Sequence, residues 1–295
     1  MTEQELQQQR RKMWLANGVG LQTLEQATEW MQSMGMCLVY PVRPAVVAPT
    51  FMAAFTGGGD RLPEESHAFE DPRAQQAREL MVRMLRQRVA YEARMFGEAN
   101  LLISAQSFPF FFALVGDRNP KQDLKKEKSS QLVQDAYAVL QREGPISKRH
   151  LAERLGGAPS EAALDRALGE LWGKLRIMRV DYRPGEGAYW DVLYRWAPEA
   201  VKQGTNLSMP QGLSALISKY LDAVIAAEQA EIENFFSAMA PRSKVREAIN
   251  ALLAAREFSF VTVGGKTMIE ITPEVVPHVP RAAAGNRVFP RRGAR

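Results

Sequence analysis

The sequence is poor in the residues that build disulfide frameworks and metal centres. Cys37 is the single cysteine among 295 residues, which excludes an intrachain disulfide and a zinc site held by cysteines. The three histidines, His67, His150 and His278, are spaced so that no two of them share one helix face. The sequence therefore predicts no metal and no cofactor.

The sequence also lacks an apolar run long enough to cross a membrane. The two longest runs, at 39–49 and 108–115, are short, and prolines and Arg43 interrupt the first. Residues 1–14 are polar and lack the apolar core of a signal peptide. We therefore expect a cytoplasmic protein, which would associate with the nucleoid if it binds DNA, and no membrane partner. No P-loop, dinucleotide-binding or GxSxG motif is present.

The net charge of +5 is concentrated at one end of the chain. Residues 277–295 contain five arginines and no acidic residue, so the other 33 of the 38 basic residues equal the 33 acidic ones. This tail is rich in proline, alanine, glycine and arginine and cannot bury enough apolar surface to fold alone. Such a tail either contacts phosphates or merely adds solubility. The balanced charge of the remaining chain gives little support to strong DNA binding by the folded part.

The most informative segment is 131–196, where three helices and a hairpin are expected in that order. Apolar residues repeat with helical spacing in 131–144, which Gly144 and Pro145 end, and in 160–176, which Ser160 can cap. A short helix at 146–157 lies between them, and it ends at a glycine pair. Two alternating runs around Pro-Gly-Glu-Gly in 177–196 predict a hairpin. This order is that of a winged helix-turn-helix, in which the third helix lies in the major groove of DNA.

The same order of elements recurs nearer the C-terminus. Two helices in 206–239 and one in 241–258 precede a hairpin with a Gly-Gly turn at 258–273. We therefore expect a mainly helical protein with small β-wings (α+β), built of tandem winged helix-turn-helix modules. The predicted domains are a helical N-terminal region with a winged-helix-like part at 1–120, a charged linker at 121–130, a central winged helix at 131–203, a C-terminal winged helix at 204–276 and the basic tail at 277–295.

The N-terminal region has a less regular pattern. Helices are expected at 3–16, 21–35 and 71–95, and a strand at 99–104. Strands or buried loops are expected at 36–41 and 48–59, and an aromatic helix or buried turn at 107–116. The arginines of 71–95 are interpreted as a solvated face, with tracking of phosphates as the alternative. The consecutive phenylalanines of 107–116 cannot all face one groove, so core packing is preferred to base stacking.

Basic residues at the starts of the helices and at the wing tips are the candidate DNA contacts. A basic helix start with free N–H groups, as at Lys148, Arg149 and His150, suits a phosphate, with a solvated surface as the alternative. On the third helix Arg166 and Lys174 could contact DNA, which Glu161, Asp165 and Glu170 would oppose. The carboxylates Asp181, Glu186 and Asp191 of the first wing are candidate catalytic groups, with a solvated surface as the alternative. The candidate DNA-binding residues are Lys148, Arg149, His150, Ser160, Arg166, Lys174, Arg183, Arg242, Lys244, Arg246 and Lys266.

The chain resembles the winged-helix DNA-binding proteins related to the AlkZ/YcaQ DNA crosslink-repair glycosylases. The resemblance covers about 20–275 and is carried by 99–114, the pattern Ala167, Leu168, Leu171, Leu175, Ile177, and the aromatic closing strand with Trp190, Tyr194 and Trp196. Enzymes of that family are expected to orient a water with a glutamine and a polar residue two positions on. The resemblance places these positions on Gly35 and Cys37, which cannot hold a water in that way.

The sequence is compatible with three functions. The expected function is that of a non-catalytic DNA-binding protein that recognises damaged or structured double-stranded DNA. One alternative is a DNA glycosylase that removes alkylated or crosslinked bases with another catalytic group. The other is a scaffold with a protein partner, which the balanced charge of the folded part favours. The sequence does not indicate the oligomeric state.

Overall fold

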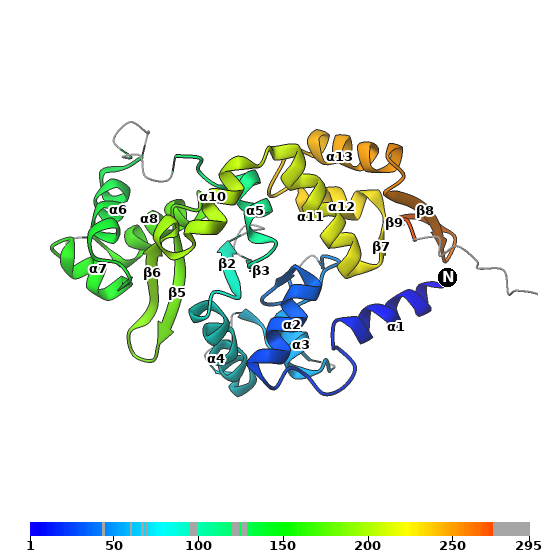
Figure 1. The fold of residues 1–295 in the computed structure, drawn as a ribbon. Helices are drawn as coiled ribbons and strands as arrows, with labels where there is room; N and C mark the ends of the chain where they lie inside the picture. The colour runs from blue at the N-terminus through cyan, green and yellow to red at the C-terminus, as the bar shows by residue number, and fades with distance from the viewer. Residues whose placement is uncertain are drawn as a thin grey trace, which may run out of the picture.

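The computed structural model describes residues 1–42, 45–59, 61–65, 68, 70–94, 99–119, 124, 129–157 and 159–273. The predictions for His67, His278, the tail at 277–295 and most of the linker at 121–130 lie outside these residues. The described part is mainly helical and has three small antiparallel sheets of three strands each. Figure 1 shows the central helices and wing at the left, the C-terminal ones at the upper right, and the N-terminal ones below and between them.

The three sheets share one topology. Their strand orders are β1-β3-β2, β4-β6-β5 and β7-β9-β8, and every pairing is antiparallel. In each case a helix, a short strand and two helices precede the two long strands of the wing. The tandem winged-helix fold is thus confirmed, and a third copy occupies the N-terminal region. The domain boundaries drawn from the sequence remain our proposal.

The first module follows this order between residues 24 and 104. Its strand β1 lies beside the last strand, and its wing is short. The elements are α2 (Leu24–Met34), β1 (Met36–Leu38), α3 (Phe51–Thr56), α4 (Pro72–Arg86), β2 (Ala90–Arg94) and β3 (Asn100–Ser104).

The central and third modules have longer wings. The central one consists of α6 (Gln131–Glu143), β4 (Ile146–Ser147), α7 (Lys148–Arg154), α8 (Glu161–Gly173), β5 (Ile177–Arg183) and β6 (Gly187–Val192). The third consists of α11 (Met209–Val224), β7 (Ala226–Ala227), α12 (Gln229–Phe236), α13 (Arg242–Ala254), β8 (Phe258–Val263) and β9 (Lys266–Ile271). The helices and wings predicted for these regions are confirmed. Hydroxyls of Ser130 and Ser160 cap α6 and α8 as serine does at a helix start.

Four further helices join the modules. They are α1 (Glu3–Met13), α5 (Phe108–Val115), α9 (Leu193–Trp196) and α10 (Pro198–Asn206). Helix α5 packs against α10 and α11, and its Phe108, Phe111 and Phe112 are buried in an apolar cluster that includes residues of all three modules. The core-packing interpretation of these phenylalanines is therefore correct. A shared core of this kind fixes the modules relative to one another.

Two sequence predictions in the N-terminal region are wrong. Residues 48–59 contain helix α3 instead of a strand or buried loop, because the Thr50 hydroxyl accepts a hydrogen bond from Ala53 N and Gly57 ends the helix in the left-handed conformation. The helix expected at 71–95 ends at Arg86. Arg88 has a φ of 58°, which reverses the chain into strand β2.

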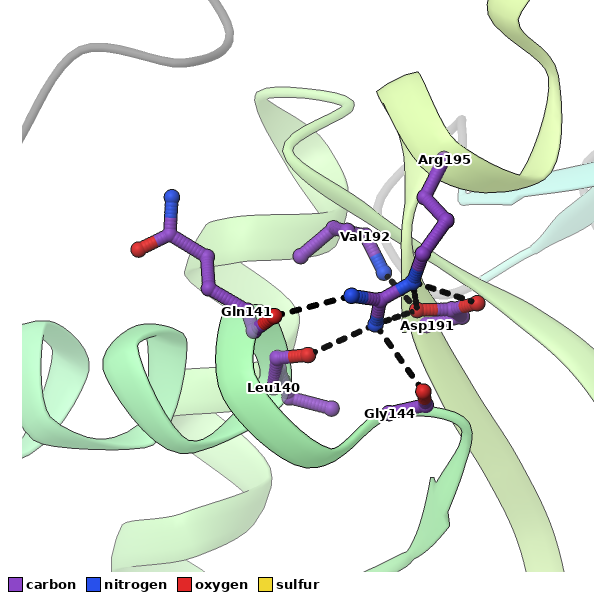
Figure 2. A network of polar contacts seen from close by, with 6 residues as sticks. All are labelled: Leu140, Gln141, Gly144, Asp191, Val192 and Arg195. Carbon is purple, nitrogen blue, oxygen red and sulfur yellow. Dashed lines mark hydrogen bonds and ion pairs between the residues drawn. The ribbon is translucent and has the colours of Figure 1, made fainter.

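The aromatic closing strand of the central wing is also shorter than predicted. Strand β6 ends at Val192, and Tyr194 and Trp196 belong to the short helix α9. The Arg195 guanidinium donates to the carbonyl oxygens of Leu140 and Gln141, both at 2.8 Å, and to that of Gly144 at 3.1 Å, while it pairs with the buried Asp191 (Figure 2). Asp191 therefore holds the arginine that satisfies the last carbonyls of α6. Asp191 therefore has a structural role, which corrects the prediction that it is a catalytic group.

Candidate nucleic-acid interface

Lys148, which starts helix α7, lies against acidic residues of the neighbouring helix α8. Its Nζ is 2.8 Å from a carboxylate oxygen of Glu161 and 2.9 Å from one of Asp165. Burial would lower the pKa of Lys148, but the hydrogen bonds to these two carboxylates raise it overall. The hydrogen bond from Lys148 in turn lowers the pKa of Glu161. Much of the charge of this cation is thus balanced before any phosphate approaches.

Most of the other predicted contacts of the central module also have intramolecular partners, and Arg166 is the exception. His150 Nδ1 is 2.8 Å from the Ser147 hydroxyl, and Ser160 caps α8. Arg166 is exposed on α8 and makes no ion pair with a described residue. The remaining predicted contacts each form an ion pair: Arg149 with Glu153, Lys174 with Glu170, and Arg183 with Asp181.

The predicted contacts of the third module are also paired. Arg242 donates to the Asn234 side chain at 2.7 Å. The other three cations lie within 3.1 Å of at least one acidic residue. The pairs are Lys244 with Glu247, Arg246 with Glu233, and Lys266 with Glu3 and, at a longer distance, Glu228. The structure therefore does not gather the predicted residues into one unpaired positive surface.

Gly35 and Cys37, where the resemblance placed a catalytic pair, lie in the interior. Gly35 ends α2 with a φ of 73°, and a Cβ built on it would be 2.2 Å from Lys219 Cγ. The Cys37 thiol is fully buried, lies 3.6 Å from Met31 Sδ, and has a pKa raised by burial. The Cys37 thiol is thus enclosed by the first module, whereas the Lys219 side chain of α11 covers Gly35.

A different surface combines hollows with charged side chains. It lies between α4 of the first module and the β5–β6 hairpin of the central one, which contact each other and are neighbours in Figure 1. We call it the wing cleft. It has an outer groove of about 560 Å³ and an inner hollow of about 230 Å³. Arg78, Val82 and Tyr182 line both.

The outer groove is bordered by the arginines of α4. Arg83 is exposed and makes no ion pair with a described residue, whereas Arg86 is 2.7 Å from Asp181 of the wing. The wing contributes its turn residues Pro184 and Gly185. The groove thus offers the Arg83 guanidinium to an anion on one side, where Glu79 also lines it, and a narrow hairpin on the other.

The inner hollow is lined by polar groups that the fold holds in place. The Glu92 carboxylate is buried and accepts from Arg179 Nη1 at 3.0 and 3.2 Å. The Arg179 guanidinium lies over the rings of Trp172 and Trp190, at 4.9 and 5.3 Å from their centroids. Trp172 also donates to the Glu92 carbonyl at 3.1 Å. These contacts join the first and central modules at the floor of the cleft.

Tyr40 and Asp181 also belong to the polar lining of the hollow. Burial raises the pKa of the Tyr40 phenol, and a hydrogen bond with Arg78 opposes that shift in part. The Asp181 side chain is 16% exposed and pairs with Arg86 and Arg183. Among the wing carboxylates considered from the sequence, Asp181 lines this hollow, while Glu186 bonds to the Tyr189 hydroxyl.

Most residues of the wing cleft were missed by reasoning from the sequence alone. The sequence shows the arginine row of α4, but its pattern favours a solvated face. Nothing local shows that residues near 78 and 182 meet, because their contact depends on how two modules pack. Among the residues predicted from the sequence, the candidate catalytic residue Asp181 lines the cleft, and the candidate DNA contact Arg183 lies beside it through its pair with Asp181.

The fold and its charged cleft define a tandem winged-helix protein. The chain belongs to the AlkZ-like DNA glycosylase family, whose model matches residues 71–290. In fold it is similar to the DNA glycosylase AlkZ of Streptomyces sahachiroi, with a TM-score of 0.57 over 92% of this chain and 70% of that one, at 13% sequence identity. No curated protein matches the chain. Family membership relates the chain to DNA repair.

Among the described residues, no helix is long and apolar enough to cross a membrane. That same part of the chain has no group of three or more histidine, cysteine or acidic side chains arranged to hold a metal ion.

Proposed function

We propose that this protein binds double-stranded DNA that is damaged or structurally irregular, and that it does so at the wing cleft without chemistry at Gly35 or Cys37. The observation that carries the proposal is the position of Arg83, an exposed arginine without an ion pair to a described residue, beside a groove formed by two winged-helix modules. Arginines beside a groove can contact phosphates, while the hairpin turn can enter a DNA groove. The family to which the chain belongs supports DNA as the partner.

The balance of charge on the predicted recognition helices supports irregular DNA over a fixed sequence. Glu161 and Asp165 are exposed on α8 and would face phosphates or base edges if that helix entered the major groove. A sequence reader would instead present arginine, asparagine or glutamine there. Contacts to the backbone and to distorted DNA need no such set of side chains.

The test is a titration of labelled duplexes with the full chain over a range of salt concentrations. Arg83→Ala should weaken binding about three- to ten-fold and reduce the slope of log affinity against log salt by about 1. Lys202→Ala removes one exposed charge on α10, away from the cleft, and should leave affinity within about two-fold. Equal effects of the two substitutions would show that the cleft is not the DNA site.

The basic tail is expected to add a contact of its own. Deleting 277–295 removes five positive charges, so it should weaken duplex binding and flatten the salt dependence. A truncated chain that binds as the full chain does would assign the contact to the folded modules alone.

Base excision is the alternative function, and one observation favours it. The inner hollow contains the carboxylates of Glu92 and Asp181 and the phenol of Tyr40, which are groups able to orient a water or accept a proton. We expect no release of alkylated bases, because Glu92 and Asp181 are already held by arginines. A time course on duplexes that contain 7-methylguanine or a crosslink tests this. Release that Asp181→Asn or Glu92→Gln abolishes would establish the alternative.

A further inference from the structure

The outer strand of each wing forms an edge of its sheet, and two of these three edges are covered by other modules. Strands β2 and β5 contact each other, β2 also packs against α8, and β5 also packs against α4. Strand β8 contacts chiefly β9 and α13 of its own module. Within the described part of the chain, the backbone of 258–263 makes hydrogen bonds only in its ladder with β9. The edge of β8 is therefore open to another strand.

The three edge strands also differ in charge. Strand β2 contains Glu92 and Arg94, and β5 contains Arg179, Asp181 and Arg183. Strand β8, with the sequence Phe-Ser-Phe-Val-Thr-Val, has no charged residue, no glycine and no proline. Charged side chains and prolines on an edge strand prevent it from pairing with another chain. The edge of β8 lacks both kinds of protection.

Exposed apolar side chains gather on the third wing. Phe260 is 62% exposed and Ile271 is 39% exposed, and both lie on one face of the wing because Phe260 pairs with Ile269. Met1 is also exposed, and its carbonyl accepts from Gly264 at the wing tip. Of the large apolar residues exposed in the described part, only Val19 lies elsewhere. Such an accumulation marks a contact surface.

A second copy of this chain fits the edge of β8. In an antiparallel pair centred on Phe260, the two Phe260 side chains are neighbours and each face of the wing continues into the same face of the other copy. The start of one β8 then lies beside the wing tip of the other. At that tip Glu3 lies so close to Gly264 that a Cβ built on the glycine would be 2.5 Å from Glu3 Cγ. Arg256, just before β8, is exposed and makes no ion pair with a described residue, so its charge complements Glu3 of the second copy.

The C-terminal segment of the same chain is a poorer occupant of this edge. It follows β9 directly, but it has prolines at 273, 277 and 280. Proline lacks the N–H that a strand donates to its neighbour, so a segment with this spacing cannot form a regular ladder. In addition, β8 offers no carboxylate to the arginines of this segment.

We propose that the protein forms a symmetric dimer in which β8 pairs antiparallel with β8 of a second copy, so that two three-stranded sheets become one sheet of six strands. Figure 1 shows β8 at the end of the molecule opposite the central module, so this contact leaves the wing cleft of each copy open. The dimer does not depend on DNA binding, and its test contains no DNA.

Sedimentation velocity of the full chain measures the association. We expect the mass to rise from 33.0 kDa toward twice that value as the concentration increases over about 1–100 µM. Phe260→Lys places like charges opposite each other in the pair and should raise the dissociation constant at least about ten-fold. Val19→Lys makes the same change of charge at an exposed apolar residue outside the third wing and should leave the association unchanged.

A charge exchange tests the antiparallel arrangement. Arg256→Glu should weaken the dimer about five-fold, because it places two acidic residues together at each end of the pair. Combining Arg256→Glu with Glu3→Arg should restore the dissociation constant to within about two-fold of the original value, since the two charges are then exchanged. Melting curves verify that each variant is folded.

Three results would overturn the dimer through β8. One is a single species of 33.0 kDa at every concentration; if deletion of 274–295 then produced a dimer, the C-terminal segment would be the occupant of the edge. The second is a dimer that persists in Phe260→Lys, which would place the contact on another surface. The third is a dimer weakened by Arg256→Glu that Glu3→Arg does not restore, which would exclude the antiparallel pair.

Discussion

The central wing and the third wing have the same topology but different neighbours. The β5–β6 hairpin faces α4 of the first module and forms a cleft with it. The β8–β9 hairpin lies beside the N-terminal helix α1, where Gly264 N donates to the Met1 carbonyl at 3.3 Å and Lys266 pairs with Glu3 at 3.1 Å (Figure 1). The central wing thus borders a cleft, whereas residues at the start of the chain cover the tip of the third wing. The same fold therefore does not imply the same contact surface.

The largest loss of stability is expected when the contacts that support the central wing are removed. Arg195→Met removes the guanidinium that satisfies the end of α6 and leaves the buried Asp191 without its partner (Figure 2). We expect a loss of about 2–3 kcal/mol in the free energy of unfolding. Urea unfolding followed by circular dichroism measures it.

The control for Arg195→Met is Arg149→Ala, which removes an exposed arginine from a pair with Glu153. Such a pair contributes only about 0.5 kcal/mol. Equal losses in the two variants would show that the network at Arg195 is no stronger than a surface ion pair.

The attachment of α1 to the third module should give the next largest effect. Arg10 is 3% exposed, and its guanidinium donates to the carbonyl oxygens of Val224 and Ala226, at 2.9 and 2.5 Å. Arg10→Met keeps the apolar stem but leaves two buried carbonyls without this donor, which should cost about 2 kcal/mol. Faster amide exchange confined to α1 and β7–β9 would be the expected signature. Exchange that rises equally in the central module would contradict a local attachment.

The central module was largely predictable because its signals are local. Serine caps, glycine stops and helical stripes lie within a few residues of the elements that they define, as at Ser130 and Ser160. Strand β2 was missed because the apolar stripe of α4 continues past Arg86, and the reversal at Arg88 depends on pairing with β3. The length of a helix is often decided by such tertiary contacts.

The candidate site was much less predictable than the fold. The sequence identified Lys148 as a cation and Glu161 and Asp165 as acids, but not the pairing between them across 13 and 17 residues. The pair between Arg179 and Glu92 joins residues 87 positions apart. Charge complementarity across a fold cannot be inferred from local spacing, and it decides which cations remain to bind a partner.

A smaller effect is expected where α1 covers the tip of the third wing. Glu3→Gln removes one of the two carboxylates beside Lys266 and should increase duplex affinity about two- to three-fold if that wing lies near DNA. Glu29→Gln makes the same change of charge at an exposed position of α2 and serves as the control. Equal gains in both variants would attribute the effect to net charge and leave the third wing without a part in binding.

The smallest expected effect is the pH dependence of the third module. Hydrogen bonds, first from Arg246 and then from Gln229, hold the pKa of Glu233 below its ordinary range. A carboxyl with a lower pKa in the folded state stabilises the protein above its unfolded pKa of about 4.3, and that contribution is lost as the pH falls through the folded pKa. Glu233→Gln should therefore lower Tm by about 1–3 °C at pH 7 and by less as the pH approaches 3.

Calorimetry of the full chain between pH 7 and pH 3 measures how the Tm of Glu233→Gln approaches that of the unmodified protein. Glu257→Gln changes an exposed glutamate that makes no ion pair with a described residue, so it should follow the unmodified protein throughout. If Glu233→Gln lowered Tm equally at pH 7 and pH 3, the loss would not come from the charge of Glu233, and its ion pair with Arg246 would contribute nothing measurable to stability. Arg246 would then be available to a phosphate. In that case the third module, like the wing cleft, would offer an arginine to DNA.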